Sequence, residues 1–466
     1  MSYSELKTGF SFSLNMKLQR ISEFQHEFSF LSSTENFDAY YARFLESDLG
    51  KIYLATPWQS LVDGLDIEEK ITGSKMLFSP RGRIALMFLK HYACCSDRKL
   101  IEQLNSNIDY QFFCDIHLGL NRLTNFKIVS QIRSELSAKL DIDKTEHILF
   151  NQWKDYIDSK NQITVDATCY ESELRYPTPQ KLLWEAVDWL YKQLRKNCKY
   201  LSIKMMRTKY IKWKKRYIGF SKMRRKTTKK RKPLTRGLLH LLNKLIGFEK
   251  ELRSTYKLEF TIHYYRRVAT IKKVHQQQQA YFNTGISPKN RIVSIAKDYL
   301  RPIVRGKEVK PVEFGAKVNK LQIDGINFIE HCSFNAFNEG TRLKSTIYKA
   351  QSLTKVKTKI IGADAIYATN KNRNFVTKNN IKTDFKRKGK LPRNYKDEKK
   401  LKTLITKERA TRLEGSFGKE KEYYHLKKIK AKTKNNEKLW IFFGIHTANA
   451  LEIGRRMYLN QRQEVA

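Results

Sequence analysis

The sequence predicts an α/β protein, with a mixed sheet flanked by helices, a mainly helical region before the sheet and a large basic helical insertion after the first strand. Two observations support this class. Short runs of β-branched and apolar residues occur at 163–170, 311–334 and 357–365, and segments with helical spacing lie between and after them. Such an alternation favours a sheet with helices packed on its faces.

The chain is long and strongly basic. Its 466 residues exceed what one hydrophobic core normally organises, so two or three domains are expected. It carries 91 Lys and Arg against 46 Asp and Glu, a net charge of +45, which is typical of a protein that binds a polyanion. Nucleic acid fits better than anionic lipid, because the sequence offers no amphipathic anchor and no apolar run of about 18 residues. We therefore expect a cytoplasmic protein without a membrane span.

The six cysteines form no C-x-x-C pair, so the sequence indicates neither a disulfide framework nor a zinc knuckle. They are expected to be reduced thiols.

The N-terminal part of the chain is expected to be helical. Residues 1 to about 70 show no clear period, but an N-cap at Ser79, with Pro80 at the first helical position, predicts a helix. Ser96 caps a second helix after a tight turn, and 121–140 has the spacing of another. The first two are compatible with a DNA-binding helix-turn-helix. A helical bundle packed on the next domain is an equally good interpretation.

The first strand is predicted at 163–170. Alternation places Ile163, Val165 and Ala167 on one face and Asp166 on the other, between two threonines. Asp166 therefore faces a different layer from its apolar neighbours.

Residues 181–305 are expected to form the insertion. A helical pattern at 181–196 leads into a basic stretch, 195–237, in which Lys and Arg alternate with Tyr, Trp, Phe and Met. Such side chains can stack on bases and neutralise phosphates together; the alternative is a solvated helical hairpin whose aromatic residues form its core. Gln276–Gln279 and 283–291 are expected to be a linker. The candidates for DNA contact are Arg224, Arg225, Lys229, Lys230 and Arg231.

Strand patterns return after the insertion. A hairpin with its turn at Asp324–Gly325 is predicted first, and Asp324 is a turn residue in this interpretation rather than a ligand. The further expected elements are a helix at 338–350, a buried strand at 357–365, a helix at 370–380, a strand at 381–385, a lysine-rich loop at 386–403 and a helical region from about 405 to 457.

Three acidic residues at the ends of these elements, Asp166, Asp364 and Glu414, are candidates for catalysis and metal binding. If the strands of the two aspartates are neighbours, their carboxylates meet at one edge of the sheet, where a crossing helix could add Glu414. Converging carboxylates repel unless cations lie between them, and Mg²⁺ accepts such ligands while retaining waters and substrate phosphates. Two ions about 4 Å apart would activate the attacking oxygen and stabilise the leaving one. Singly, each residue could instead pair with a lysine, cap a turn or lie exposed on a helix.

The motifs around these residues resemble those of a known family. They are DATCYESELRYPTP from 166, RPIVRGKEVKPVEFGAK from 301, GADAIYATNKNR from 362 and RLEGSFGKEK from 412, with SPRGRIALMFLK from 79 and TANALEIGRR from 447. Over residues 70–457 they are similar to signatures of DDE transposases from bacterial insertion sequences, in the insertion sequence five superfamily.

The resemblance implies an RNase H-like core in which Asp166, Asp364 and Glu414 bind two Mg²⁺ ions, with Mn²⁺ as a substitute. It implies hydrolysis at the ends of a mobile element, then attack of the freed 3′-OH on target DNA. The implied partners are double-stranded DNA, from the terminal repeats and the target, and a second copy of the chain in a synaptic homodimer at the bacterial nucleoid. The expected domains are 1–155 for DNA binding, 156–180 with 306–460 for catalysis, and 181–305 for the insertion.

The resemblance also implies a lysine seven residues after the glutamate. Lys421 lies there, on the same helical face as Glu414, and would contact DNA near the cut. The family's arginine four residues before the glutamate is absent, because Ala410 occupies that position. Arg409 and Arg412 flank it, and the sequence leaves open which of them replaces it. Lys419 and Arg373 are further candidates for DNA contact.

Two other functions match parts of the sequence. The run from His263 to Arg266 fits the H-x-x-R of tyrosine recombinases, with Tyr299 downstream as a nucleophile, but the other motifs of that family are missing. A transposase-derived repressor that binds DNA without cutting it would keep the helical region and the basic insertion. The presence of all three carboxylates favours catalysis.

Overall fold

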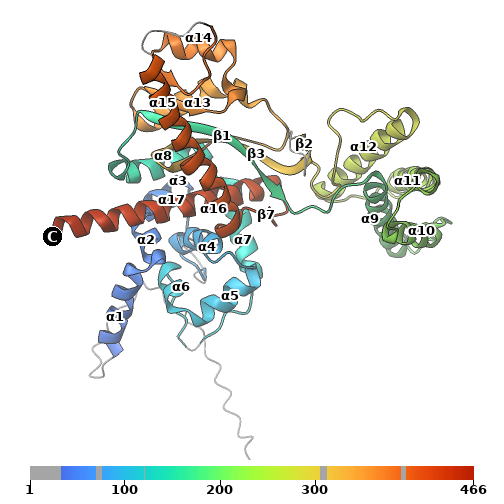
Figure 1. The fold of residues 1–466 in the computed structure, drawn as a ribbon. Coiled ribbons are helices and arrows are strands. Elements are labelled where there is room, and N and C mark those ends of the chain that lie inside the picture. Colours follow the sequence, from blue (N-terminus) through green and yellow to red (C-terminus); the bar gives the residue numbers. More distant parts are fainter. Residues whose placement is uncertain (1–32, 70–75, 120, 305–311, 390–394, 466) are drawn as a thin grey trace, which may run out of the picture.

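The computed structural model describes residues 33–69, 76–119, 121–304, 312–389 and 395–465. The expected boundary between insertion and catalytic core, at 305/306, lies outside these residues. Figure 1 shows a body in which the sheet and most helices pack together, and a separate helical lobe that two chain segments join to it. Among the described residues, no helix has the length and apolarity needed to cross a membrane.

The sheet is mixed, as the alternation of elements predicts. Its main strands are β1 (Gln162–Ser172), β3 (Val312–Ile323), β4 (Ile326–Ser333), β5 (Ile360–Ala363) and β6 (Lys382–Thr383). They lie in the order β4-β3-β1-β5-β6, with β3 and β4 antiparallel to their neighbours and β5 and β6 parallel to β1. Two short strands extend it: β2 (Pro302–Val304) pairs with β3, and β7 (Lys428–Ile429) pairs with β1.

The predicted hairpin of β3 and β4 is present, with its turn at Asp324–Gly325. Both residues have positive φ, 48° and 83°, which asparagine, aspartate and glycine adopt most readily. The Asp324 carboxylate accepts hydrogen bonds at 3.0 Å from Arg412 and at 3.0 Å from Arg456. These two arginines fix the turn against two different helices, so Asp324 has a structural partner on each side.

Helices cover both faces of the sheet. Asn319 and Lys320 are consecutive on β3 and so point to opposite faces: Asn319 bonds Thr346 of α13 (Leu343–Thr354) at 3.1 Å, while Lys320 reaches α16 (Gly415–Tyr423). A 3-10 turn, η3 (Glu339–Thr341), precedes α13, and η4 (Ala365–Tyr367) and α14 (Asn370–Lys378) lie between β5 and β6.

The C-terminal part differs from the prediction in two places. The second half of the expected lysine-rich loop is a helix, α15 (Tyr395–Glu408), because its Lys, Glu and Leu residues are good helix formers and Glu398 pairs with Lys402 one turn on. The expected helical region from about 405 to 457 is interrupted at 424–433, which contains β7, and resumes as α17 (Lys434–Val465). A π-helical turn, η5 (Arg409–Glu414), joins α15 to α16.

The N-terminal helices pack directly on the rest of the body. They are α1 (Ser33–Glu46), α2 (Asp48–Ala55), α3 (Trp58–Gly64), α4 (Pro80–Tyr92), α5 (Asp97–Ser106), α6 (Ile108–Phe113), α7 (Lys127–Lys139) and α8 (Ile142–Trp153). As predicted, Ser79 caps α4, accepting from Gly82 N at 3.0 Å. One hydrophobic core includes these helices, the sheet and α17, and the rings of Phe88 and Phe443 meet at 5.0 Å.

The two helices of the possible helix-turn-helix differ in burial. Nearly all of α4 is buried, including Arg83 and Lys90, which pair with Glu135 and Asp97. The second helix, α5, where such a motif has its recognition helix, keeps Arg98 and Lys99 exposed. Packing of α4 in a bundle is therefore shown, and DNA contact through α5 stays a prediction.

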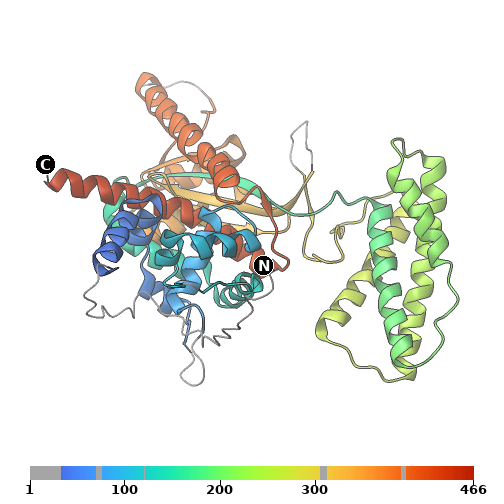
Figure 2. The ribbon, with the colours of Figure 1, turned by 90° about the horizontal axis from the view of Figure 1, so that it is seen from below.

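The lobe is a bundle of α9 (Pro179–Tyr200), α10 (Tyr210–Lys222), α11 (Thr228–Thr255) and α12 (Ile262–Thr284), with a hydrophobic core of its own (Figure 2). Most of its aromatic residues pack against neighbouring helices: the rings of Tyr191 and Tyr210 stack at 3.8 Å, and those of Trp184 and Tyr217 at 5.2 Å. These four rings are therefore not free to stack on bases in this packing. Tyr200, in the basic stretch, is 83% exposed. Gln276–Gln279 belongs to α12 and is not a linker, since glutamine is a good helix former and Gln278 is buried.

A buried ion pair joins α16 to the sheet. Lys320 and Glu420, with side chains 0% and 1% exposed, contact each other at 2.6 Å. Glu420 also accepts from the hydroxyl of Tyr170 on β1 and, at 3.2 Å, from Asn327 on β4. A buried charge needs this number of partners to offset its lost hydration.

We expect Glu420→Gln to lower the free energy of unfolding by about 3 kcal/mol, because it leaves the Lys320 ammonium buried without a counter-charge. The measurement is urea denaturation of the full chain. The control is Glu422→Gln two residues on, where an exposed carboxylate pairs with Lys427 at 2.8 Å; it should cost less than about 1 kcal/mol. Equal effects of the two substitutions would contradict the role given to the buried pair.

Candidate active site

The register of the sheet brings Asp166 and Asp364 together. Val165 on β1 is paired with Ala363 on the parallel strand β5, so the next residue of each strand is one of the two aspartates. Each carboxylate accepts a hydrogen bond from the following backbone N–H, of Ala167 at 2.7 Å and of Ala365 at 2.6 Å. These local bonds hold both side chains at the end of the strand pair.

Asp166 lies in an environment that disfavours its charge. Burial, followed by the nearby carboxylates of Glu339 and Asp364, raises its pKa to about 6, against the opposing effects of the Ala167 N–H and of Arg409. A carboxyl whose pKa is raised by burial and by neighbouring carboxylates lies in a site that a cation would stabilise.

Two further carboxylates that the sequence analysis did not single out lie nearby. Asp384, 4% exposed, follows β6 and accepts from the N–H of Ala363 at 3.0 Å, and burial raises its pKa. The sequence did offer a signal for Asp384, because it lies near the end of the strand predicted at 381–385, as Asp364 does in the strand predicted at 357–365. Glu339 lies in η3 and pairs with Lys317 at 2.7 Å. Nothing in its local sequence distinguishes it.

Glu414 approaches from the helix that crosses this end of the sheet. Its neighbour helix α15 lies close to β5 because Gly362 has no side chain: a Cβ there would lie 2.8 Å from Ile405. Glu414 ends the π-helical turn, is 49% exposed and accepts from Arg409 at 3.3 Å. In the part of the chain that the structure describes, no three acidic, histidine or cysteine side chains are grouped closely enough to hold a metal ion.

Lys421 lies on the face of the sheet that carries Asp166. Its ammonium donates to Thr168, two residues beyond Asp166 on β1, at 3.0 Å, and lies 5.9 Å from the centre of the Tyr170 ring. The structure thus brings Asp166, Asp364 and Lys421 to one region of the sheet.

The other cationic candidates of the body have different surroundings. Arg412 pairs with Asp324 at 3.0 Å and with Glu408 at 3.1 Å, and not with Asp166 or Asp364. Arg373 donates to the carbonyl of Ala368 at 3.0 Å and lies over the ring of Phe385.

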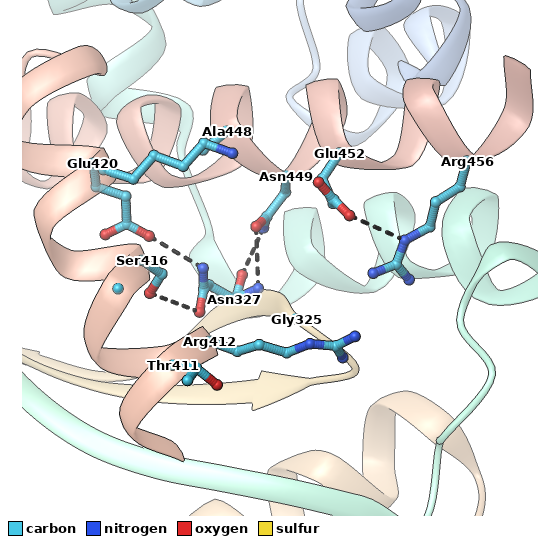
Figure 3. A pocket seen from close by; sticks show the side chains of 12 residues that line it. Gly325, Asn327, Thr411, Arg412, Ser416, Glu420, Ala448, Asn449, Glu452 and Arg456 are labelled. Atoms are coloured by element: carbon cyan, nitrogen blue, oxygen red, sulfur yellow. Dashed lines mark hydrogen bonds and ion pairs between the residues drawn. The ribbon is translucent and has the colours of Figure 1, made fainter. Parts of the chain in front are cut away.

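Lys419 lines a cavity of about 390 Å³ between the hairpin turn, α16 and α17. Figure 3 shows this cavity: Asn327 is the centre of its polar network, linked to Ser416, Glu420 and Asn449. None of the three predicted catalytic carboxylates is among its lining residues. The cavity is therefore separate from the site of Asp166, Asp364 and Glu414.

The basic candidates of the lobe form one exposed segment. Between Asp188 and Glu249 the sequence has 21 Lys and Arg and no acidic residue. Arg224, Arg225, Lys229, Lys230 and Arg231 all lie exposed in the connection between α10 and α11 and in the first turn of α11. The cations point outward, which is the arrangement of a surface that attracts phosphates by charge, while most aromatic side chains of the stretch, Tyr200 excepted, pack on the bundle.

The residues of the tyrosine-recombinase alternative have other partners. The Tyr299 hydroxyl donates to buried Glu437 at 3.0 Å, and burial together with that carboxylate raises its pKa. Arg266 pairs with Asp298 through two contacts of 2.7 Å. A tyrosine whose ionisation is suppressed is a poor nucleophile.

The carboxylate groups of Asp166 and Asp364 are ligands of the kind that a divalent metal accepts. Asp166 and Asp364 offer carboxylate oxygens side by side, and Mg²⁺ is usually held by one or two carboxylates together with waters and substrate phosphates. Burial is the main cause of the raised pKa of Asp166, and a bound cation would offset this cost of its negative charge.

Asp166 within β1 and Asp364 directly after β5 thus lie on adjacent strands, with Lys421 beside Asp166. Residues 361–445 match a family described as the transposase DDE domain. This segment contains Asp364, Glu414 and Lys421 and supports a DDE transposase, an enzyme class whose substrate is DNA. No match was found among curated proteins or solved structures.

We expect Asp166→Asn to stabilise the protein at pH 7 by about 3 kcal/mol. The folded carboxyl holds its proton up to about pH 6, against 3.8 normally, so its ionisation lowers stability as the pH rises through that window. Asparagine carries no such cost. The measurement is the melting temperature of both proteins at pH 7 and pH 4, and the difference should vanish at pH 4. A variant that is less stable at pH 7 would contradict this account.

Proposed function

We propose that this protein is a DNA transposase that cleaves the ends of a mobile element and transfers them to target DNA by a metal-dependent DDE mechanism. The observation that carries the proposal is the pairing of Val165 with Ala363, which sets Asp166 beside Asp364 within a chain that matches the transposase DDE domain. The strand order β4-β3-β1-β5-β6 supports an RNase H-like core. The finer assignment, to bacterial insertion sequences of the insertion sequence five superfamily, rests on the sequence motifs.

In this proposal Asp166 and Asp364 hold the metal, with Glu414 as the third ligand. A bound pair of divalent ions would supply an activated oxygen nucleophile and stabilise the leaving oxygen. The residues of the chain position the DNA: Lys421, fixed by Thr168 beside Asp166, would bind a phosphate next to the scissile bond. The buried strand residues Val165 and Ala363, which directly precede the two aspartates, would help to hold the carboxylates in place, as such chemistry requires.

The lobe would hold the DNA at a second place. Its exposed cations and lack of acidic residues over 60 positions favour phosphate contact without base readout. Two element ends must be joined in one complex, so we propose a synaptic homodimer. A cytoplasmic location at the nucleoid follows from the same function.

The first test is cleavage of DNA that carries the inverted repeats flanking the gene. We expect cutting with Mg²⁺ or Mn²⁺, and none with EDTA. Asp166→Asn, Asp364→Asn and Glu414→Gln should each lower the rate more than about 100-fold, because even outer partners of metal ligands contribute 10–100-fold. DNA affinity is the control and should be kept. If the wild type binds these ends and never cuts them, the protein is a DNA-binding repressor instead.

The second test concerns the lobe. Changing Arg224, Arg225, Lys229, Lys230 and Arg231 to glutamine should weaken DNA binding and flatten its salt dependence, by about 0.9 in the slope of log affinity against log salt for each phosphate that the protein no longer neutralises. The matched control changes the three arginines to lysine, which keeps the charge, and should leave the slope unchanged. An unchanged slope in the glutamine variant would remove the lobe from the DNA interface.

A further inference from the structure

The helix that carries Glu414 contains a one-residue irregularity at the site. Residues 395–423 are helical throughout, but the turn Arg409–Glu414 is π-helical, with hydrogen bonds between residues five apart. In an α-helix the side chains four apart lie over one another; in a π-helical turn those five apart do. Arg409 and Glu414 are five apart, and Arg409 Nη1 lies 3.3 Å from Glu414 Oε1.

The π-helical turn therefore decides which residue faces Glu414. Ala410, four residues before it, would take that place in an α-helix. The extra residue in the turn gives the place to Arg409. Arg412, the other neighbouring arginine, points to the hairpin turn and pairs with Asp324.

Arg409 has a second carboxylate partner on the sheet. Its Nε lies 3.7 Å from Asp384, and the two side chains are 15% and 4% exposed. Asp384 in turn accepts from the N–H of Ala363, the last residue of β5 and the neighbour of Asp364. A continuous chain of polar contacts thus runs from the end of β5 through Asp384 and Arg409 to Glu414.

We propose that Asp384 and Arg409 are positioning residues that set the distance and orientation of Glu414 relative to the strand end bearing Asp364, and that the π-helical turn exists to place Arg409 for this. This inference rests on the proposed function, in which Glu414 is a metal ligand. A guanidinium suits the task because its planar fork can bind two carboxylates in fixed directions, which a lysine ammonium cannot.

The test is Mn²⁺ binding to the full chain without DNA, followed by electron paramagnetic resonance. Outer partners of ligating carboxylates typically contribute 10–100-fold to metal affinity. We expect Arg409→Ala and Asp384→Asn each to weaken Mn²⁺ binding by about 10-fold or more, at a melting temperature close to that of the wild type. Lys402→Ala, which removes a cation paired with Glu398 earlier in the same helix, is the matched control and should bind Mn²⁺ as the wild type does.

A double variant, Arg409→Ala with Ala410→Arg, tests the register. It keeps the arginine but moves it one position along the helix, so the π-helical turn should leave it off the Glu414 face and Mn²⁺ affinity should stay low. Recovery of affinity in this variant would overturn the role of the π-helical turn. Unchanged or tighter Mn²⁺ binding by Arg409→Ala and Asp384→Asn would overturn the positioning role, tighter binding meaning that Arg409 merely competes with the metal.

The outcomes separate this inference from the proposed function. A wild-type chain that binds no Mn²⁺ and cuts no DNA would reject the metal-dependent reaction itself. A wild-type chain that binds Mn²⁺, with variants that bind it equally well, would reject only the positioning by Asp384 and Arg409.

Discussion

The buried Lys320–Glu420 ion pair is the interaction on which the site depends. Lys320 lies directly opposite Asp166 in the pairing of β3 with β1. Burial lowers the pKa of Lys320, and the opposing effect of Glu420 is smaller. A buried ammonium needs a counter-charge, and Glu420 of α16 provides one at 2.6 Å. Glu420 therefore draws α16 onto the strands. This contact places Lys421 at Thr168, and it places Glu414, about two helical turns earlier, at the edge of the sheet.

Much of the sheet could be predicted from local patterns, because each strand has a distinct alternation and the hairpin has a turn sequence that allows positive φ. The sequence analysis expected Asp166 and Asp364 to meet if their strands are neighbours, and β1 and β5 are neighbours. The inward packing of Tyr210 and Tyr217 could not be predicted, since a basic amphipathic helix has the same pattern whether its aromatic side meets DNA or a neighbouring helix. Likewise, the lysines at 396–402 suggested a loop but form a helix once Ile405 packs on Gly362.

The candidate site, like the fold, was predictable only in part. Asp166 lies inside β1 and Asp364 directly follows β5, on strands that the sequence marks, whereas the partners of Glu414 depend on the hydrogen bonding of a single turn. A π-helical turn inserts one residue without any characteristic residue type, so counting along the sequence assigned the position of the arginine to Ala410. Glu339 reaches the cluster from a short 3-10 turn whose place is set by Lys317 on the sheet.

The insertion has a consequence for how the chain folds. β1 and β3 pair at Ile163 and Ile323, on either side of the whole lobe, and such distant pairing slows folding because a long loop must close first. The lobe has its own hydrophobic core, and buried Glu437 of α17 bonds Ser172 and Lys297, on the segments that enter and leave it. If the lobe folds first, its two ends are brought together and the remaining loop is short. The lobe would then act as an internal folding aid for the sheet that it interrupts.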